Sequence, residues 1–263
     1  TCDGPGVTDF AGRPGAPGLK LHQLPAPGRY PIDTPYSGPD VPLRFRYRTY
    51  EFGGEDIHLR TLRDTQQYSD PSGLAHDLGI SAANWSLFGV VWDSSQVLAR
   101  YMADFQIDGK RILELGCGIA LSSLLLNRRG GDITATDYHP EAGSFLLANT
   151  RLNNDCEIPF FRANWNDEAI TDGSFDLIIG SDVLYERDQL APLARFIEDH
   201  AKPTCEVVLT DPGRKQQGIF RREMSHYGFE CSKEQPADTA SYLSSLYSGA
   251  ILRYRRDSQC RAS

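Results

Sequence analysis

The stretch ILELGCGIAL, residues 112–121, decides the fold of this 263-residue chain. An apolar, strand-like run leads into Gly116 and Gly118, and a helix-like segment follows. A strand that turns into a helix through glycines brings backbone N–H groups close to a ligand, because glycine has no side chain and adopts left-handed conformations. We interpret the stretch as a turn that binds a nucleotide-like cofactor; a purely structural turn is the alternative.

The residues around this turn argue against the two best-known phosphate-binding motifs. A dinucleotide fingerprint, G-x-G-x-x-G, would need a third glycine where the chain has Leu121. The turn also lacks the GK[ST] ending of a phosphate loop. Glu114, two residues before the first glycine, is unfavourable beside a pyrophosphate but suits a cofactor that carries an ammonium and a sulfonium charge.

Strands and helices alternate along the chain beyond Gly109. Such alternation predicts an α/β fold, a mostly parallel sheet with helices on both faces and a ligand at the carboxyl ends of its strands. The expected strands are 111–116, 132–137, 158–164, 175–181, 205–210 and 249–255, and the expected helices are near 120–129, 140–153, 188–201 and 215–227.

Two further strand ends carry side chains that fit an adenosine. Asp137, 21 residues after Gly116, ends the strand DITATD, and its carboxylate can accept both ribose hydroxyls. After the next strand, Asn164 can hydrogen-bond the adenine edge and Trp165 can pack on its face, although an aromatic residue there also suits a core. Because these groups follow the glycine turn at successive strand ends, we infer that the cofactor is S-adenosylmethionine, with S-adenosylhomocysteine as product.

The N-terminal part has a different character. Residues 1–42 are rich in proline and glycine and lack any helical or alternating period, so we expect a flexible arm. From Phe45, FRYRTYEFGGEDIHLRTLRD alternates polar and apolar residues around a Gly-Gly pair, which predicts a β-hairpin. A helix is expected from Asp93 or Ser94. The arm is thus followed by a single domain over 43–263, divided into the hairpin and its connection (43–90) and the catalytic core (91–256).

The charge, the hydropathy pattern and the cysteine spacing argue against several classes of binding partner. A formal net charge of −8 argues against binding to a nucleic-acid backbone, which needs clustered Lys and Arg. No apolar run approaches the roughly 18 residues of a membrane span, so no membrane contact is expected. The six cysteines are scattered, without CxxC pairs or metal-ligand spacing, and we expect reduced thiols, no metal site and a cytoplasmic monomer.

These motifs together resemble the class I, seven-β-strand S-adenosylmethionine-dependent methyltransferases. More narrowly, the chain resembles the protein lysine methyltransferases that include the enzymes modifying the electron-transfer-flavoprotein β subunit and valosin-containing protein. The resemblance covers about residues 45–256, and the quoted motifs are GVVWDSSQVLARYM (89–102), ILELGCGIAL (112–121), TATD (134–137), ANW (163–165), GSDVLYE (180–186) and DPGR (211–214).

The resemblance implies a Rossmann-like sheet that is mostly parallel with a C-terminal antiparallel strand, helices on both faces, and a small N-terminal hairpin. The sequence departs from the family at Ala120, where a third glycine is more common, and alanine could narrow the turn. The implied cofactor contacts are Trp92 over the methionine end, Glu114, Gly116 and Gly118 along the methionine and ribose side, Asp137 on the ribose, and Asn164 and Trp165 beside the adenine.

The catalytic residues implied by the same resemblance are Asp182 and Tyr185, which match the family's Asp-x-x-Tyr motif facing the substrate. They would orient the amine by hydrogen bonds, and Asp182 could accept its proton. We count Ser181 with the cofactor residues, as a small side chain that leaves space. His139 follows the ribose-binding strand, and we expect it at the surface.

The acceptor of the methyl group stays open from the sequence. A protein substrate methylated on a lysine side chain is our first reading. A small-molecule amine on the same scaffold is the alternative, and a non-catalytic binding module of the same fold is a third reading that the intact motifs argue against.

Overall fold

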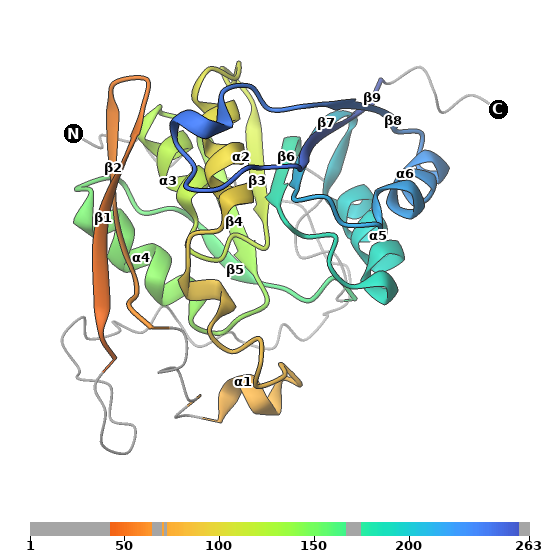
Figure 1. Ribbon diagram of the computed structural model, residues 1–263. Helices are drawn as coiled ribbons and strands as arrows, with labels where there is room; N and C mark the ends of the chain where they lie inside the picture. The colour runs from red at the N-terminus through yellow and green to blue at the C-terminus, as the bar shows by residue number, and fades with distance from the viewer. Residues whose placement is uncertain (1–42, 65–69, 71–72, 167–174, 258–263) are drawn as a thin grey trace, which may run out of the picture. The chain divides into compact units, whose positions relative to one another are not determined.

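The computed structural model describes residues 43–64, 70, 73–166 and 175–257 (Figure 1). The arm expected over 1–42 lies outside the described residues.

A seven-stranded sheet forms the centre of the domain, in the order β5-β4-β3-β6-β7-β9-β8. Strand β9 is antiparallel to both of its neighbours, whereas the pairs from β5 through β7 are parallel, so the expected sheet and its C-terminal antiparallel strand are confirmed. The strands are β3 (Arg111–Leu115), β4 (Asp132–Asp137), β5 (Phe160–Arg162), β6 (Phe175–Ser181), β7 (Ala201–Asp211), β8 (Glu230–Glu234) and β9 (Ala250–Arg256).

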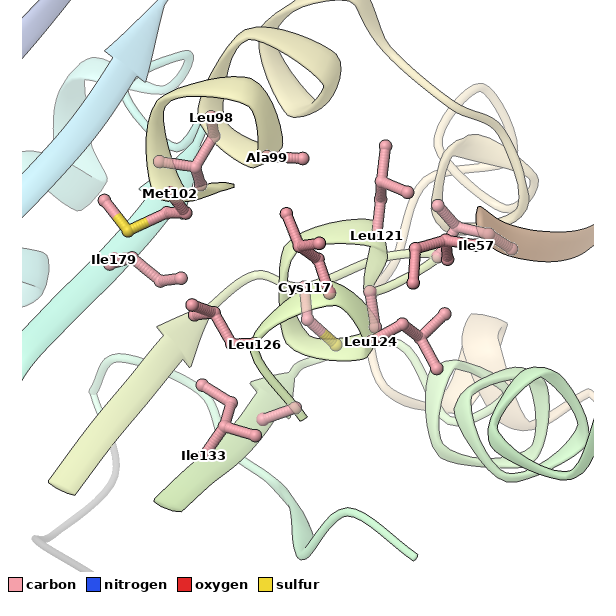
Figure 2. Packing of buried hydrophobic residues seen from close by; sticks show 14 of the residues in the cluster. Ile57, Leu98, Ala99, Met102, Cys117, Leu121, Leu124, Leu126, Ile133 and Ile179 are labelled. Carbon is pink, nitrogen blue, oxygen red and sulfur yellow. The ribbon is translucent and has the colours of Figure 1, made fainter. Parts of the chain in front are cut away.

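Helices cover both faces of the sheet because its central strands are apolar on both sides. Ile112 of β3 packs in one buried cluster with α2 and α3, and its neighbour Leu113 packs in a second cluster with α5 and α6. Figure 2 shows the first cluster, where Leu98 and Met102 of α2 lie close to Ile179 of β6. The helices are α1 (Leu74–Asp77), α2 (Asp93–Ala103), α3 (Leu121–Arg128), α4 (Ala142–Leu152), α5 (Leu190–His200) and α6 (Gln217–His226), with short 3-10 turns at Leu87–Gly89, Arg187–Gln189 and Thr239–Ser241.

The predicted N-terminal hairpin is present as β1 (Phe45–Phe52) and β2 (Glu55–Leu62), an antiparallel pair beside α3 and α4 (Figure 1). Two asparagines, Asn149 of α4 and Asn153 directly after it, bond to the backbone of β2. Asn149 accepts the Arg60 N–H at 2.7 Å, and Asn153 both accepts the His58 N–H at 2.8 Å and donates to its carbonyl at 2.7 Å. These amide groups replace a neighbouring strand, so they satisfy the edge of β2 and fix the hairpin on the domain.

Two expectations need correction. Strand β8 was not expected, because its sequence ECSKE is polar and mostly exposed at the sheet edge and carries no apolar alternation. Cys117, Cys205 and Cys231 are free thiols as expected, but Cys156 is disulfide-bonded, so the expectation of reduced thiols is wrong for that residue. Among the described residues, no helix has the length and apolar character needed to cross a lipid bilayer.

Candidate active site

The glycine turn has the backbone conformation that its sequence predicts. Gly116 and Gly118 both lie in the left-handed region, with φ of 54° and 52°. A Cβ on Gly118 would lie 3.3 Å from the carbonyl oxygen of Phe88, so the turn runs close under the 3-10 segment before α2. Ala120, where the resemblance leads one to expect a third glycine, is also left-handed, with φ of 61°, and it caps the start of α3 at a steric cost.

Asp137 ties the end of β4 to this turn. Its Oδ2 accepts the Gly118 N–H at 2.7 Å, and its Oδ1 accepts the His139 N–H at 2.7 Å. Burial raises the pKa of Asp137, and these backbone hydrogen bonds oppose the rise because they favour the ionised form. A carboxylate offers about four lone-pair sites, so about two remain to accept hydroxyl groups of a ligand.

Glu114 is 2% exposed and hydrogen-bonded within the core. Its Oε2 accepts both the backbone N–H of Ser123, at 2.9 Å, and the Ser123 hydroxyl. Burial raises the pKa of Glu114 to about 7, against the opposing effect of the Ser123 bonds. Because both bonds use Oε2, any contact from this carboxylate to a ligand must come from Oε1.

The strand end after β5 carries the two residues expected beside an adenine. Asn164 is half-buried, and its Oδ1 accepts the backbone N–H of Asn166 at 2.9 Å. Trp165 is also half-buried and packs against the apolar cluster below α5 and α6. Packing against the core therefore orients Trp165, and the Asn166 bond holds the amide of Asn164.

Trp92 immediately precedes α2 and is 45% exposed. Its indole N–H donates to the Leu87 carbonyl at 3.1 Å, and its own carbonyl accepts the Ser95 N–H at 3.0 Å. The start of α2 is also held from the other side, because the Ser94 hydroxyl lies 3.0 Å from the Tyr247 hydroxyl. The indole is thus fixed in orientation while much of its surface stays open.

Asp182 follows Ser181, the last residue of β6, and has a left-handed backbone with φ of 53°. Its N–H donates to the Thr210 carbonyl of β7 at 2.8 Å, which fixes the residue against the neighbouring strand. Its carboxylate forms a bidentate ion pair with Arg214, with Nε at 2.5 Å from Oδ1 and Nη2 at 2.8 Å from Oδ2.

Tyr185 lies beside this ion pair and is 48% exposed, with the Arg214 guanidinium carbon 5.9 Å from its ring centroid. The pKa of Tyr185 is raised to about 12 by burial and by the negative charges of Glu186, Asp137 and Asp182. Strand β3 lies between β4 and β6 and is parallel to both, so the polar groups at the carboxyl ends of β4 and β6 lie at the same edge of the sheet. The phenol stays protonated at neutral pH and can donate or accept a hydrogen bond.

Two residues of this site were missed by the sequence reasoning. Arg214 lies in the DPGR motif, to which the sequence assigns no role. The motif follows β7, the neighbour of β6, and this adjacency could have indicated that Arg214 lies near Asp182. Tyr247 lies in a polar loop and carried no sequence signal. The pKa of Tyr247 is raised to about 12, mainly by burial and also by the charges of Asp211 and Asp182. The hydrogen bond to Ser94 acts in the opposite direction and lowers it.

The expectation of a surface position for His139 is wrong. The side chain is 5% exposed and stacks on Phe88 with ring centroids 4.0 Å apart. Burial lowers the pKa of His139 to about 4, so the ring is neutral near pH 7. Its role is packing between the end of β4 and the segment before α2. In the described part of the chain, no group of three or more His, Cys, Asp or Glu side chains is arranged to hold a metal ion.

Comparison with known proteins assigns a family to this arrangement. A family model described as lysine methyltransferase matches residues 77–225. EEF1A lysine methyltransferase 3 of Mus musculus is 29% identical over 198 residues, which cover 68% of this chain and 84% of that protein. The electron transfer flavoprotein beta subunit lysine methyltransferase of Mus musculus is 29% identical over 157 residues, which cover 58% of this chain and 55% of that protein.

Solved structures with low sequence identity share the fold. The magnesium protoporphyrin IX methyltransferase of Synechocystis PCC 6803, solved with bound S-adenosylmethionine, has a TM-score of 0.52 at 15% identity, covering 74% of this chain and 98% of that one. A TehB-like methyltransferase of Corynebacterium glutamicum has a TM-score of 0.51 at 17% identity, covering 71% and 100%. These likenesses identify the sheet as that of the Rossmann-like methyltransferases.

Proposed function

The chain belongs to the lysine methyltransferase family, and on that premise we propose that it transfers the methyl group of S-adenosylmethionine to a lysine side chain of a protein substrate. The two relatives described above are named as lysine methyltransferases of proteins, which supports a protein rather than a small amine as acceptor. The observation that carries the proposal is the Asp182–Arg214 ion pair with Tyr185 beside it at the carboxyl ends of β6 and β7, on the sheet edge where the glycine turn of β3 also lies.

The residues around the glycine turn fit an adenosyl cofactor. The left-handed glycines bring the backbone close to a ligand, and the free lone pairs of Asp137 suit two ribose hydroxyls. When bound, S-adenosylmethionine supplies an activated methyl group on a positively charged sulfur. We assign Asn164 and Trp165 to the adenine side, and Trp92, Glu114 and Ser181 to the methionine side.

The substrate side has to present a neutral amine, although the pKa of a free lysine is about 10.4. A carboxylate close to the amine would stabilise the ammonium form and so oppose the reaction. Arg214 removes this difficulty because its charge balances that of Asp182. The bidentate pair leaves lone pairs on the carboxylate, so Asp182 can still orient the amine through hydrogen bonds.

Tyr185 completes this arrangement from the other side. Its hydroxyl stays protonated near neutral pH, because the pKa is raised to about 12. A neutral phenol can accept a hydrogen bond from the amine without adding a negative charge that would favour the ammonium. We therefore assign Asp182 and Tyr185 to direct contact with the substrate and Arg214 to positioning Asp182.

The test is incubation of the protein with labelled S-adenosylmethionine and a cell extract, followed by identification of the labelled species. We expect label in protein, on lysine, and its loss in the Asp182→Asn variant. Label confined to small molecules would contradict the protein-substrate proposal and favour the small-amine alternative. We also propose that the enzyme is a monomer in the cytoplasm, which light scattering and fractionation would check.

A further inference from the structure

A basic groove of about 600 Å³ lies between the β1–β2 hairpin and the start of α2. The whole chain carries a net charge of −8, whereas the cluster of arginines gives this groove a local positive charge. The groove is lined by four arginines and two aspartates, namely Arg44, Arg46, Arg48 and Arg63 against Asp64 and Asp93.

Strand β1 sets the spacing of these cations. Arg44, Arg46 and Arg48 are alternate residues of extended chain, so their side chains leave the same face about 7 Å apart. Arg46 and Arg48 are exposed, and β1 is held in register with β2 through pairs such as Arg46 with Thr61. A bound peptide in an extended conformation has the same repeat, so carboxylates on its alternate residues would lie opposite successive arginines.

Three arginines of this groove, Arg46, Arg48 and Arg63, differ from several arginines elsewhere in the domain. Arg128, Arg253 and Arg256 each form an ion pair with a carboxylate of the domain itself. Among the ion pairs between described residues, none involves the side chains of Arg46, Arg48 or Arg63. Their charges are therefore available to a partner.

The groove adjoins the start of α2, and its hairpin wall is anchored to the domain. Asn149 of α4 and Asn153, which directly follows α4, hydrogen-bond the second strand of the hairpin. Val91 and Asp93, the neighbours of Trp92 on either side, both line the groove. Ser244 lines it too, and the next residue, Ser245, donates to Asp93 at 3.1 Å. The groove therefore lies beside the start of α2, which Trp92 immediately precedes.

We propose that this groove binds an acidic, extended segment of the protein substrate, next to the lysine that is methylated. The inference rests on the proposed function and specifies its substrate class. Acidic peptide is favoured over nucleic acid, because Asp64 and Asp93 interrupt the arginines, and a continuous phosphate backbone would have to place charges against these carboxylates. A peptide can place its carboxylates opposite the arginines alone.

The direct test is binding of fluorescein-labelled peptides followed by anisotropy. One peptide carries a single lysine flanked by alternating Glu and Ala, and the second replaces each Glu with Gln. We expect wild-type protein to bind the acidic peptide about tenfold more tightly, and the Arg46→Gln/Arg48→Gln variant to lose this preference. The Arg221→Gln/Arg222→Gln variant makes the same charge change on exposed arginines of α6 and should behave as wild type.

Equal affinity of wild-type protein for both peptides, or an unchanged preference in the Arg46/Arg48 variant, would overturn the proposal. Tighter binding of a single-stranded RNA oligonucleotide than of the acidic peptide would overturn it as well. Methyl transfer to the acidic peptide gives a second readout, in which the Arg46/Arg48 variant should raise KM about tenfold and leave kcat within twofold. If the peptide binds but is not methylated, the result would support the groove as a peptide-binding site and would contradict the proposed function.

Discussion

Asp182 and Arg214 form a bidentate ion pair between the ends of β6 and β7, with nitrogen–oxygen distances of 2.5 and 2.8 Å. The two residues are 32 positions apart in the chain, and the pairing of β6 with β7 brings them together. The carboxylate implied to face the substrate is therefore already balanced by a cation. Under the proposed function, this pairing sets the charge that an incoming lysine meets.

Arg214→Gln should shift the pH dependence of turnover to alkaline values. Without the guanidinium, the charge of Asp182 would stabilise the substrate ammonium and raise its pKa by about one unit or more. We expect the pH profile of kcat to move by that amount, with activity at pH 7 about tenfold lower and recovered at higher pH. Arg214→Lys keeps the charge and should move the profile less, and a uniform loss at all pH values would contradict the charge argument.

Asp137 and Asp182 should affect different steps. Asp137→Asn removes a charged acceptor next to the glycine turn, so affinity for S-adenosylmethionine in calorimetry should fall about 10- to 100-fold. Asp182→Asn should leave that affinity within about twofold and lower kcat about 100-fold. Equal losses of cofactor affinity in both variants would refute this division of roles.

Gly118→Ala should weaken both stability and cofactor binding. The left-handed backbone costs an alanine about 1–2 kcal/mol, and the new Cβ would lie 3.3 Å from the Phe88 carbonyl oxygen. The matched control is Gly130→Ala, which is also left-handed with φ of 76° but meets no atom within 4 Å. Urea unfolding should show a loss in both variants, and only Gly118→Ala should lower cofactor affinity.

Glu114→Gln should change how stability depends on pH. The pKa of Glu114 is raised from 4.5 to about 7 in the folded protein, so its contribution is fully present below pH 4.5 and is lost as pH rises through 7. We expect the variant to gain stability relative to wild type over this window, by up to roughly 3 kcal/mol. The measurement is the free energy of unfolding at pH 4.5 to 8.

His139 has the opposite dependence, because its pKa is lowered to about 4 and its contribution is lost as pH falls through that value. Both proteins contain His139, so its effect cancels in the difference between wild type and Glu114→Gln. A difference that stays constant from pH 4.5 to 8 would contradict the raised pKa of Glu114.

The predictable parts of the fold are those that carry local signals. The apolar run before Gly116 and the repeating strand–helix pattern predicted β3, β4 and the order of helices, because a buried strand needs such side chains. The Gly-Gly pair predicted the hairpin. Strand β8 escaped prediction because its register depends on β9 rather than on its own polar sequence.

The sequence by itself determined the glycine turn and the acidic residue at the end of β4, and it predicted the class of cofactor, since each depends on residue types at short spacing. Only the tertiary structure decided that Arg214 neutralises Asp182, that His139 is buried, and that the arginines of β1 face a groove beside Trp92. These relationships depend on which strands are neighbours and on the docking of the hairpin by Asn149 and Asn153. The physical reason is that side-chain charge and burial are set by partners distant in the chain, which no local pattern records.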